Sequence, residues 1–147
     1  MTSTNPVWTR IAIITGRVIF AGVFAMSTTM KFTDIGGTAG YIASVGFPAA
    51  GLLAWLAALF ELGLFVALLS GAYFREAALA AAAYVLFLGL TFHGPAHWAG
   101  NPMEFGFFVD HFTFIAGLLF AAVHGPGDIL VLKLSLLGRN HPLASRA

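Results

Sequence analysis

The sequence predicts an all-α membrane protein, a four-transmembrane-helix bundle with its N- and C-termini cytoplasmic. Two observations carry this prediction. The chain has 147 residues, of which 59% are hydrophobic and only 9% are charged, whereas a soluble domain carries roughly 25% charged residues. Four apolar runs with short gaps between them each approach the ~20 residues that a helix needs to cross the bilayer. We therefore expect a single membrane domain over residues 1–147.

The four predicted spans cover residues 11–30, 48–69, 72–92 and 104–123. None alternates as barrel strands do, and four strands would be too few to close a barrel. The first connection, residues 31–47, mixes glycines with small polar and apolar residues, so we expect a partly helical interfacial loop. Residues 126–138 follow the breaker Gly125-Pro126-Gly127 and are too short to span. They are predicted to form an interfacial segment or a short strand.

Basic residues near the ends of the spans predict the orientation of the bundle, because they favour the cytoplasmic side. The side of the N-terminus collects five of them: Arg10, Arg75, Lys133, Arg139 and Arg146. The other side has only Lys31. Both termini are therefore expected inside and the connection 93–104 outside, as in a multi-pass protein of a bacterial-type inner (plasma) membrane.

Charge and cysteine content exclude several classes of function. The net charge is +1 and no basic stripe is present, so nucleic acid is not an expected partner. The chain has no cysteine, which excludes thiol redox chemistry, disulfides and thiolate metal sites within it. The expected partners are the lipid bilayer and other membrane or membrane-associated protein subunits.

Two charges lie deep inside predicted spans, Arg17 in the first and Glu61 in the second. A charge in the hydrocarbon is costly unless it is paired, so each needs a partner. At 1.5 Å per residue, Arg17 lies ~9 Å and Glu61 ~12 Å from the cytoplasmic ends of their spans. We therefore expect an intramembrane ion pair between them. Such a pair either fixes the register of two helices or handles protons.

Other polar residues crowd the external ends of the spans. This outer polar cluster comprises Lys31, His93, His97, Glu104, Asp110 and His111. Histidines with a carboxylate can hold Zn, Cu or Fe, and the candidates for such a metal site are His93, His97, Glu104 and His111. The alternative is an interfacial polar loop, and because no tight ligand motif is present, a metal is not expected. Asp110 could instead form an outer ion pair with Lys31.

A recognisable order of motifs runs along the chain. The first span carries Arg17 and ends in Lys31-Phe32, and the second carries Glu61-Leu62-Gly63. The third span ends at His93, and a glycine- and leucine-rich fourth span closes on Gly125-Pro126-Gly127. This order resembles the DoxX family of small four-helix membrane proteins. That family often has a lysine–asparagine pair entering the fourth helix, where this chain has Asp110-His111.

The resemblance implies membrane redox chemistry. DoxX-like proteins have been linked to a thiosulfate:quinone oxidoreductase, in which a related four-helix chain is one subunit, and to oxidative-stress complexes. We therefore expect a membrane subunit of a quinone-linked redox system that binds quinone or anchors a redox partner, and that is not clearly catalytic alone. The catalytic candidates are Asp110, His111 and His93, and the Arg17–Glu61 pair could also contact quinone.

Aromatic residues of the fourth span could form a slot for the quinone head group. They are Phe105, Phe107, Phe108, Phe112 and Phe114. The alternative is that they face lipid, which is the default for apolar side chains in a span.

Two other functions fit the same sequence. A non-catalytic accessory subunit of a larger membrane complex would suit four short helices with small loops. A small transporter or channel could be lined by Arg17, Glu61 and Asp110, but four spans without an inverted repeat fit this function least.

Overall fold

The computed structural model describes residues 6–132 and 134–137, and this part of the chain is helical without strands. Four helices are long and apolar enough to cross a membrane: α1 (Val7–Thr33), α3 (Ala50–Ser70), α4 (Phe74–Phe92) and α5 (Pro102–His124). The short α2 (Ile35–Ser44) lies between α1 and α3, and the 3-10 helix η1 (Pro95–His97) follows α4. The predicted four-helix membrane bundle is confirmed, and so is a partly helical first connection.

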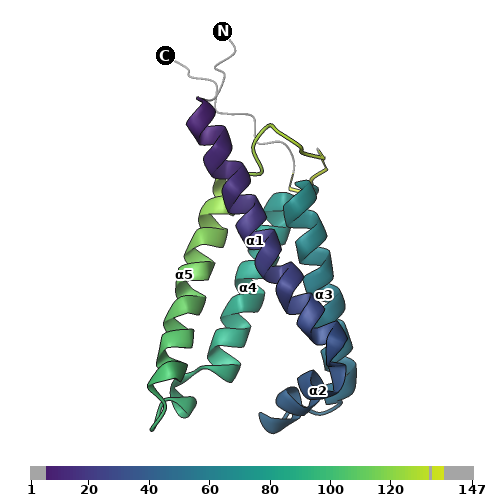
Figure 1. Cartoon of the computed structure of the whole chain (residues 1–147), viewed down its shortest axis with the longest axis vertical. Helices are drawn as coiled ribbons and strands as arrows, with labels where there is room; N and C mark the ends of the chain where they lie inside the picture. Colours follow the sequence, from purple (N-terminus) through teal and green to yellow (C-terminus); the bar gives the residue numbers. More distant parts are fainter. Residues whose placement is uncertain (1–5, 133, 138–147) are drawn as a thin grey trace.

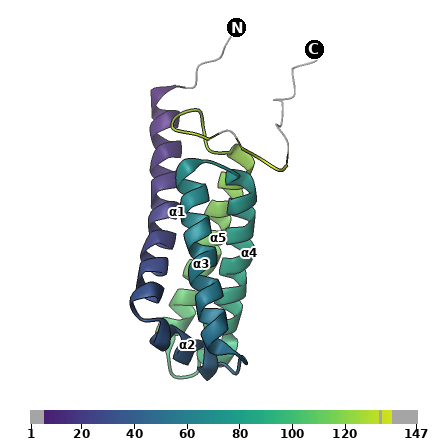
Figure 2. The same ribbon diagram turned by 90° about the vertical axis from the view of Figure 1, so that its right-hand side faces the viewer.

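The helices pack mainly as two pairs, α1 with α3 and α4 with α5. Figure 1 shows α1 crossing the bundle at a tilt, and the pairs diverging toward the end where α2 lies. α1 begins at the opposite end, which is also the end at which α5 finishes (Figure 2). We call these the α2 end and the Arg17 end. The longest departure from the predicted boundaries is the start of α1, at Val7 rather than residue 11.

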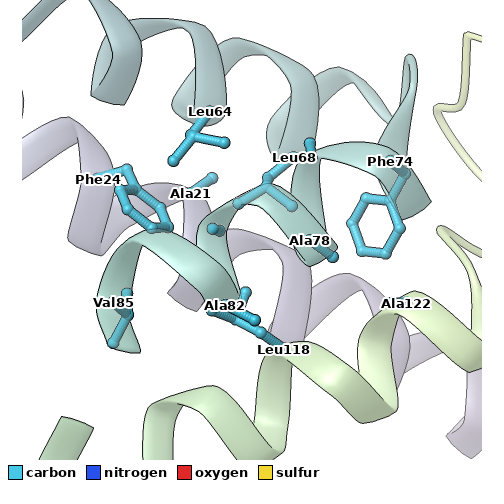
Figure 3. Close-up of a cluster of buried hydrophobic side chains, with 12 residues drawn as sticks. Ala21, Phe24, Leu64, Leu68, Phe74, Ala78, Ala82, Val85, Leu118 and Ala122 are labelled. Atoms are coloured by element: carbon cyan, nitrogen blue, oxygen red, sulfur yellow. The ribbon is translucent and has the colours of Figure 1, made fainter. Parts of the chain in front are cut away.

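The core lies between the four long helices and is centred on the alanine-rich face of α4. Ala78 and Ala81 are fully buried there, because small side chains let neighbouring helices approach closely. Leu68 of α3 and Leu118 of α5 pack in the same core cluster as these alanines, and both leucines are fully buried. Figure 3 shows these leucines converging with Phe24 of α1 on α4. α4 is therefore the central helix of the bundle.

The outer faces of the long helices carry large apolar side chains. Leu52 and Leu59 on α3 and Phe120 on α5 are each more than half exposed. A soluble protein rarely exposes an apolar surface of this extent, whereas lipid-facing side chains of a span are apolar by default. The chain is a membrane protein whose outer faces contact the lipid bilayer.

Arg17 is buried, with 5% of its surface exposed, but it does not pair with Glu61. Its guanidinium instead donates to five backbone carbonyls: Leu68 (3.5 Å), Leu69 (2.6 Å), Pro126 (3.1 Å), Ile129 (2.8 Å) and Leu130 (3.0 Å). The predicted Arg17–Glu61 ion pair is therefore wrong. We call this arrangement the Arg17 clamp.

The error in the predicted pair has a geometric reason. Long side chains on a helix point back toward its N-terminus, so Arg17 reaches toward the Arg17 end rather than straight across. It meets α3 at Leu68 and Leu69, seven and eight residues past Glu61, which is ~11 Å along a helix. A depth estimated from helix ends ignores this displacement.

The Arg17 clamp also completes the end of α3. The last four carbonyls of a helix have no partner within it, and such groups are costly in the membrane. All four carbonyls of α3 have donors here. The N–H of Gly71 donates to Ala67, the Arg17 guanidinium donates to Leu68 and Leu69, and the N–H of Leu132 donates to Ser70. The negative end of the α3 dipole further favours the guanidinium charge.

The segment that follows α5 is fastened a second time. We call residues 125–132 and 134–137 the C-terminal strap. Glu76, in the first turn of α4, accepts hydrogen bonds from Ser135 Oγ and from the N–H groups of Leu136 and Leu137. The described part of the predicted segment 126–138 contains no strand, so the short-strand alternative is wrong there. Lys133 and residues 138–147, with Arg139 and Arg146, lie outside the described residues.

Replacing Arg17 with methionine should release the strap and leave carbonyls at the end of α3 without donors. Because hydrogen bonds to a charged group contribute about 1.5–3 kcal/mol each, we expect the free energy of unfolding to fall by at least about 3 kcal/mol. Denaturant unfolding in detergent measures this loss, and proteolysis of the strap should accelerate in parallel.

The matched control is Arg10→Met in the same helix. Arg10 makes a partly exposed ion pair with Asp128 at 3.1 Å, which is worth no more than about 1 kcal/mol. Equal losses in the two variants would contradict a specific role for the Arg17 clamp.

Candidate functional site

The bundle has a half-open cavity of about 570 Å³ at its α2 end. Its walls come from the end of α1, from α2, from the first half of α3, from the second half of α4 and from α5. We call it the bundle cavity. Its apolar lining residues are Ile42, Phe47, Leu53, Leu56, Ala57, Phe60, Phe87, Leu88 and Phe92. Its polar lining residues are Lys31, Thr38, Tyr41, Tyr84, His93 and His111.

Glu61 lies directly behind two of these polar side chains. Its carboxylate is 1% exposed, and the Lys31 ammonium lies 2.9 Å from Oε2. The Tyr84 hydroxyl donates to Oε1 at 2.8 Å. The buried carboxylate therefore has an opposite charge and a hydrogen-bond donor, as a charge in the membrane requires. We call Lys31, Glu61 and Tyr84 the buried triad.

Lys31 reaches Glu61 for the same reason that Arg17 does not. Its side chain folds back toward the N-terminus of α1, where the ammonium donates to Ser27 Oγ at 2.8 Å, one turn earlier. This direction takes the charge from the end of α1 into the bundle. The expected outer ion pair between Lys31 and Asp110 is consequently absent, and Asp110 is exposed on α5.

Two histidines form the other polar part of the cavity wall. His93 Nδ1 lies 2.6 Å from Glu104 Oε2, and the rings of His93 and His111 have centroids 5.0 Å apart. His111 Nδ1 lies 2.7 Å from the carbonyl oxygen of Phe107. A Cβ at Gly89 would lie 3.0 Å from the Cβ of His111, so this glycine lets α5 place the imidazole against α4.

The outer polar cluster is therefore only partly assembled. Lys31, His93 and His111 line the bundle cavity and Glu104 orients His93, whereas His97 in η1 is exposed, as is Asp110. Within residues 6–132 and 134–137, no group of three or more histidine, aspartate and glutamate side chains could hold a metal ion.

The phenylalanines of α5 do not form the expected slot, and the aromatic residues of the cavity wall come from other elements. None of the phenylalanines of α5 lines the cavity. The phenylalanines that do are Phe47, Phe60, Phe87 and Phe92. Most of the α5 set is exposed on the lipid-facing surface, as the alternative interpretation stated.

α2 closes the cavity and contributes residues that sequence reasoning missed. Asp34 caps α2 by accepting from Gly37 N–H at 2.8 Å, and Tyr41 stacks on Phe92 of α4 with ring centroids 4.9 Å apart. Burial, and then the charge of Glu104, raises the pKa of the Tyr41 phenol, which stays protonated at neutral pH. Asp34 is an N-cap residue type and was the clearest local signal for this helix in the sequence.

Residues 12–94 match the family model DoxX. This is more than half of the chain. The chain belongs to the DoxX family. No curated protein and no solved structure matches it.

The DoxX match covers α1 to α4 and ends just past His93. It therefore includes the Arg17 side of the clamp, the buried triad and one of the two cavity histidines. Glu104 and His111 lie on α5, beyond the matched region. The DoxX region thus builds most of the bundle cavity, and α5 completes its wall.

Replacing Lys31 with methionine should destabilise the bundle, because Glu61 would remain buried without its counter-charge. Breaking a buried ion pair from one side costs about 3–5 kcal/mol. The double variant Lys31→Met with Glu61→Gln removes both charges and should recover more than half of this loss. Unfolding in detergent measures each step of the cycle. Additive losses would show that the two side chains do not interact.

Proposed function

We propose that this DoxX-family protein is an integral membrane subunit of a quinone-linked redox system and that the bundle cavity binds the quinone head group. The observation that carries the proposal is the cavity itself, about 570 Å³ within the bundle with aromatic walls and a few polar groups. Sites for small organic ligands have volumes of ~300–1,000 Å³ and this kind of lining.

The chemistry of the wall supports a ring with oxygen substituents. Phe60 and Phe87 offer flat apolar faces to a ring. Lys31 can supply an N–H donor to a carbonyl oxygen, since an ammonium has three hydrogens and Lys31 makes one hydrogen bond, to Ser27, beside its ion pair with Glu61. The imidazoles of His93 and His111 supply further polar contacts at the α2 end.

A ligand of the bilayer also suits the position of the cavity. It lies between membrane-spanning helices whose outer faces contact lipid, so a lipophilic carrier can approach without crossing water. The chain has no cysteine, and thiol chemistry would have to come from another subunit. We propose that this partner is a membrane or membrane-associated protein and that the complex works in a bacterial-type inner membrane with both termini of this chain inside.

The cavity favours this function over the two alternatives. A purely structural subunit has no need of a cavity lined by aromatic rings and a few polar groups, whereas a ligand site does. A channel lined by Arg17, Glu61 and Asp110 finds no support in their positions, since Arg17 is bound in the clamp and Asp110 lies on the outer surface.

Filling the cavity tests the proposal. Ala57 of α3 lines the cavity, so Ala57→Phe should occupy the space of the ring and lower the affinity for decylubiquinone at least tenfold. The measurement is saturation binding to the purified protein in nanodiscs, with a photoreactive quinone to map the contact. The control is Ala83→Phe, at an exposed position of α4, which should bind like the wild type.

Two results would contradict the proposal. One is the absence of saturable binding to a wild-type protein that is folded by circular dichroism. The other is an equal loss of affinity in Ala57→Phe and Ala83→Phe, which would place the ligand outside the cavity.

A further inference from the structure

The hydrogen bonds already made by the cavity wall determine which atoms remain for a ligand. A side chain that donates its hydrogen to the protein offers the cavity only lone pairs. Donors and acceptors left over on the wall therefore select the hydrogen-bonding character of whatever binds. This inference rests on the proposed quinone site and deepens it.

Each of the two cavity histidines has one ring nitrogen already engaged with a protein oxygen. The carbonyl of Phe107 can only accept, so His111 Nδ1 carries the hydrogen of that 2.7 Å contact. The carboxylate of Glu104 likewise accepts from His93 Nδ1 at 2.6 Å. In a neutral imidazole with the hydrogen on Nδ1, Nε2 is a lone-pair acceptor. Each ring thus presents an acceptor as its remaining polar atom.

The hydroxyl groups nearby follow the same pattern. Thr38 of α2 donates to the carbonyl of Asp34 at 3.0 Å, and Tyr84 donates to Glu61 at 2.8 Å. Both oxygens keep only acceptor capacity toward the cavity. Within the described residues the Tyr41 hydroxyl makes no hydrogen bond, so it can donate or accept.

The one fixed donor on the wall lies elsewhere. The Lys31 ammonium is held beside Ser27 and Glu61, in the buried triad. Tyr84 of that triad lies nine residues before His93 on α4, or ~13 Å along the helix. A single aromatic ring at the imidazoles therefore meets a wall on which acceptors outnumber donors.

We propose that the bundle cavity, with both imidazoles neutral, selects the reduced, hydroxyl-bearing hydroquinone over the oxidised quinone, with His93 and His111 as the specificity-determining residues. A hydroquinone O–H group can donate to Nε2 of either imidazole. A quinone has only acceptor oxygens, which would face lone pairs at this end of the cavity. Desolvated polar groups left unpaired in this way cost binding free energy.

The test compares the affinities of decylubiquinol, decylubiquinone and the dimethyl ether of decylubiquinol for the protein in nanodiscs under argon. We expect the quinol to bind roughly tenfold more tightly than the quinone, the order of one hydrogen bond to a buried partner. The ether keeps the reduced ring but has no O–H, so it should bind as weakly as the quinone.

Variants then assign the preference to the imidazoles. Glutamine can donate as well as accept, so His93→Gln combined with His111→Gln should reduce the tenfold ratio to about threefold or less while binding itself persists. Phe87→Leu, in the apolar wall, is the control. It should weaken both ligands and leave their ratio unchanged, as any purely structural effect would.

The outcomes separate this inference from the proposed function. Equal affinities for quinol and quinone, or tighter binding of the quinone, would overturn the selectivity and leave the quinone site standing. An unchanged ratio in the double glutamine variant would remove the two histidines as its cause. Failure of all three ligands to bind would end the proposed function as well.

Discussion

The bundle depends on one constraint: inside a membrane, no water is present to satisfy a charge or a backbone carbonyl. Arg17 and Lys31, the two cations on the inner face of α1, both have partners, and the partners are of different kinds. Arg17 is surrounded by carbonyl oxygens, which a planar fork of N–H donors can reach in several directions. Lys31, a compact charge, is held by a single carboxylate. α1 is thus tied to α3 at two levels.

The close-packed core and the cavity lie in different parts of the bundle. Around Ala78 and Ala81 the helices approach closely, because alanine leaves little to hold them apart. Toward the α2 end, α4 carries Tyr84 and Phe87 instead, and these larger side chains stand at the wall of a cavity. The close-packed half stabilises the arrangement, so the other half can remain open to a ligand.

Much of the fold was predictable from the sequence, since lengths and hydropathy of apolar runs determine spans directly. The charges inside the spans were also identified, but not their partners. The Arg17–Glu61 prediction failed because the Arg17 side chain points back toward the N-terminus of α1 and meets α3 about two helical turns beyond Glu61. Tyr84 was missed because a tyrosine in an apolar run looks like packing. Only the fold showed that its hydroxyl meets Glu61.

The Arg17 clamp has a consequence for biogenesis. Three of its acceptors lie 109 to 113 residues further along the chain. A growing chain enters the membrane from its N-terminus, so α1 arrives with a guanidinium whose partners have not been synthesised. The guanidinium gains three of its five acceptors only after residues 126–130 have been synthesised. The Arg17 clamp is therefore completed late, when the C-terminal strap reaches the bundle.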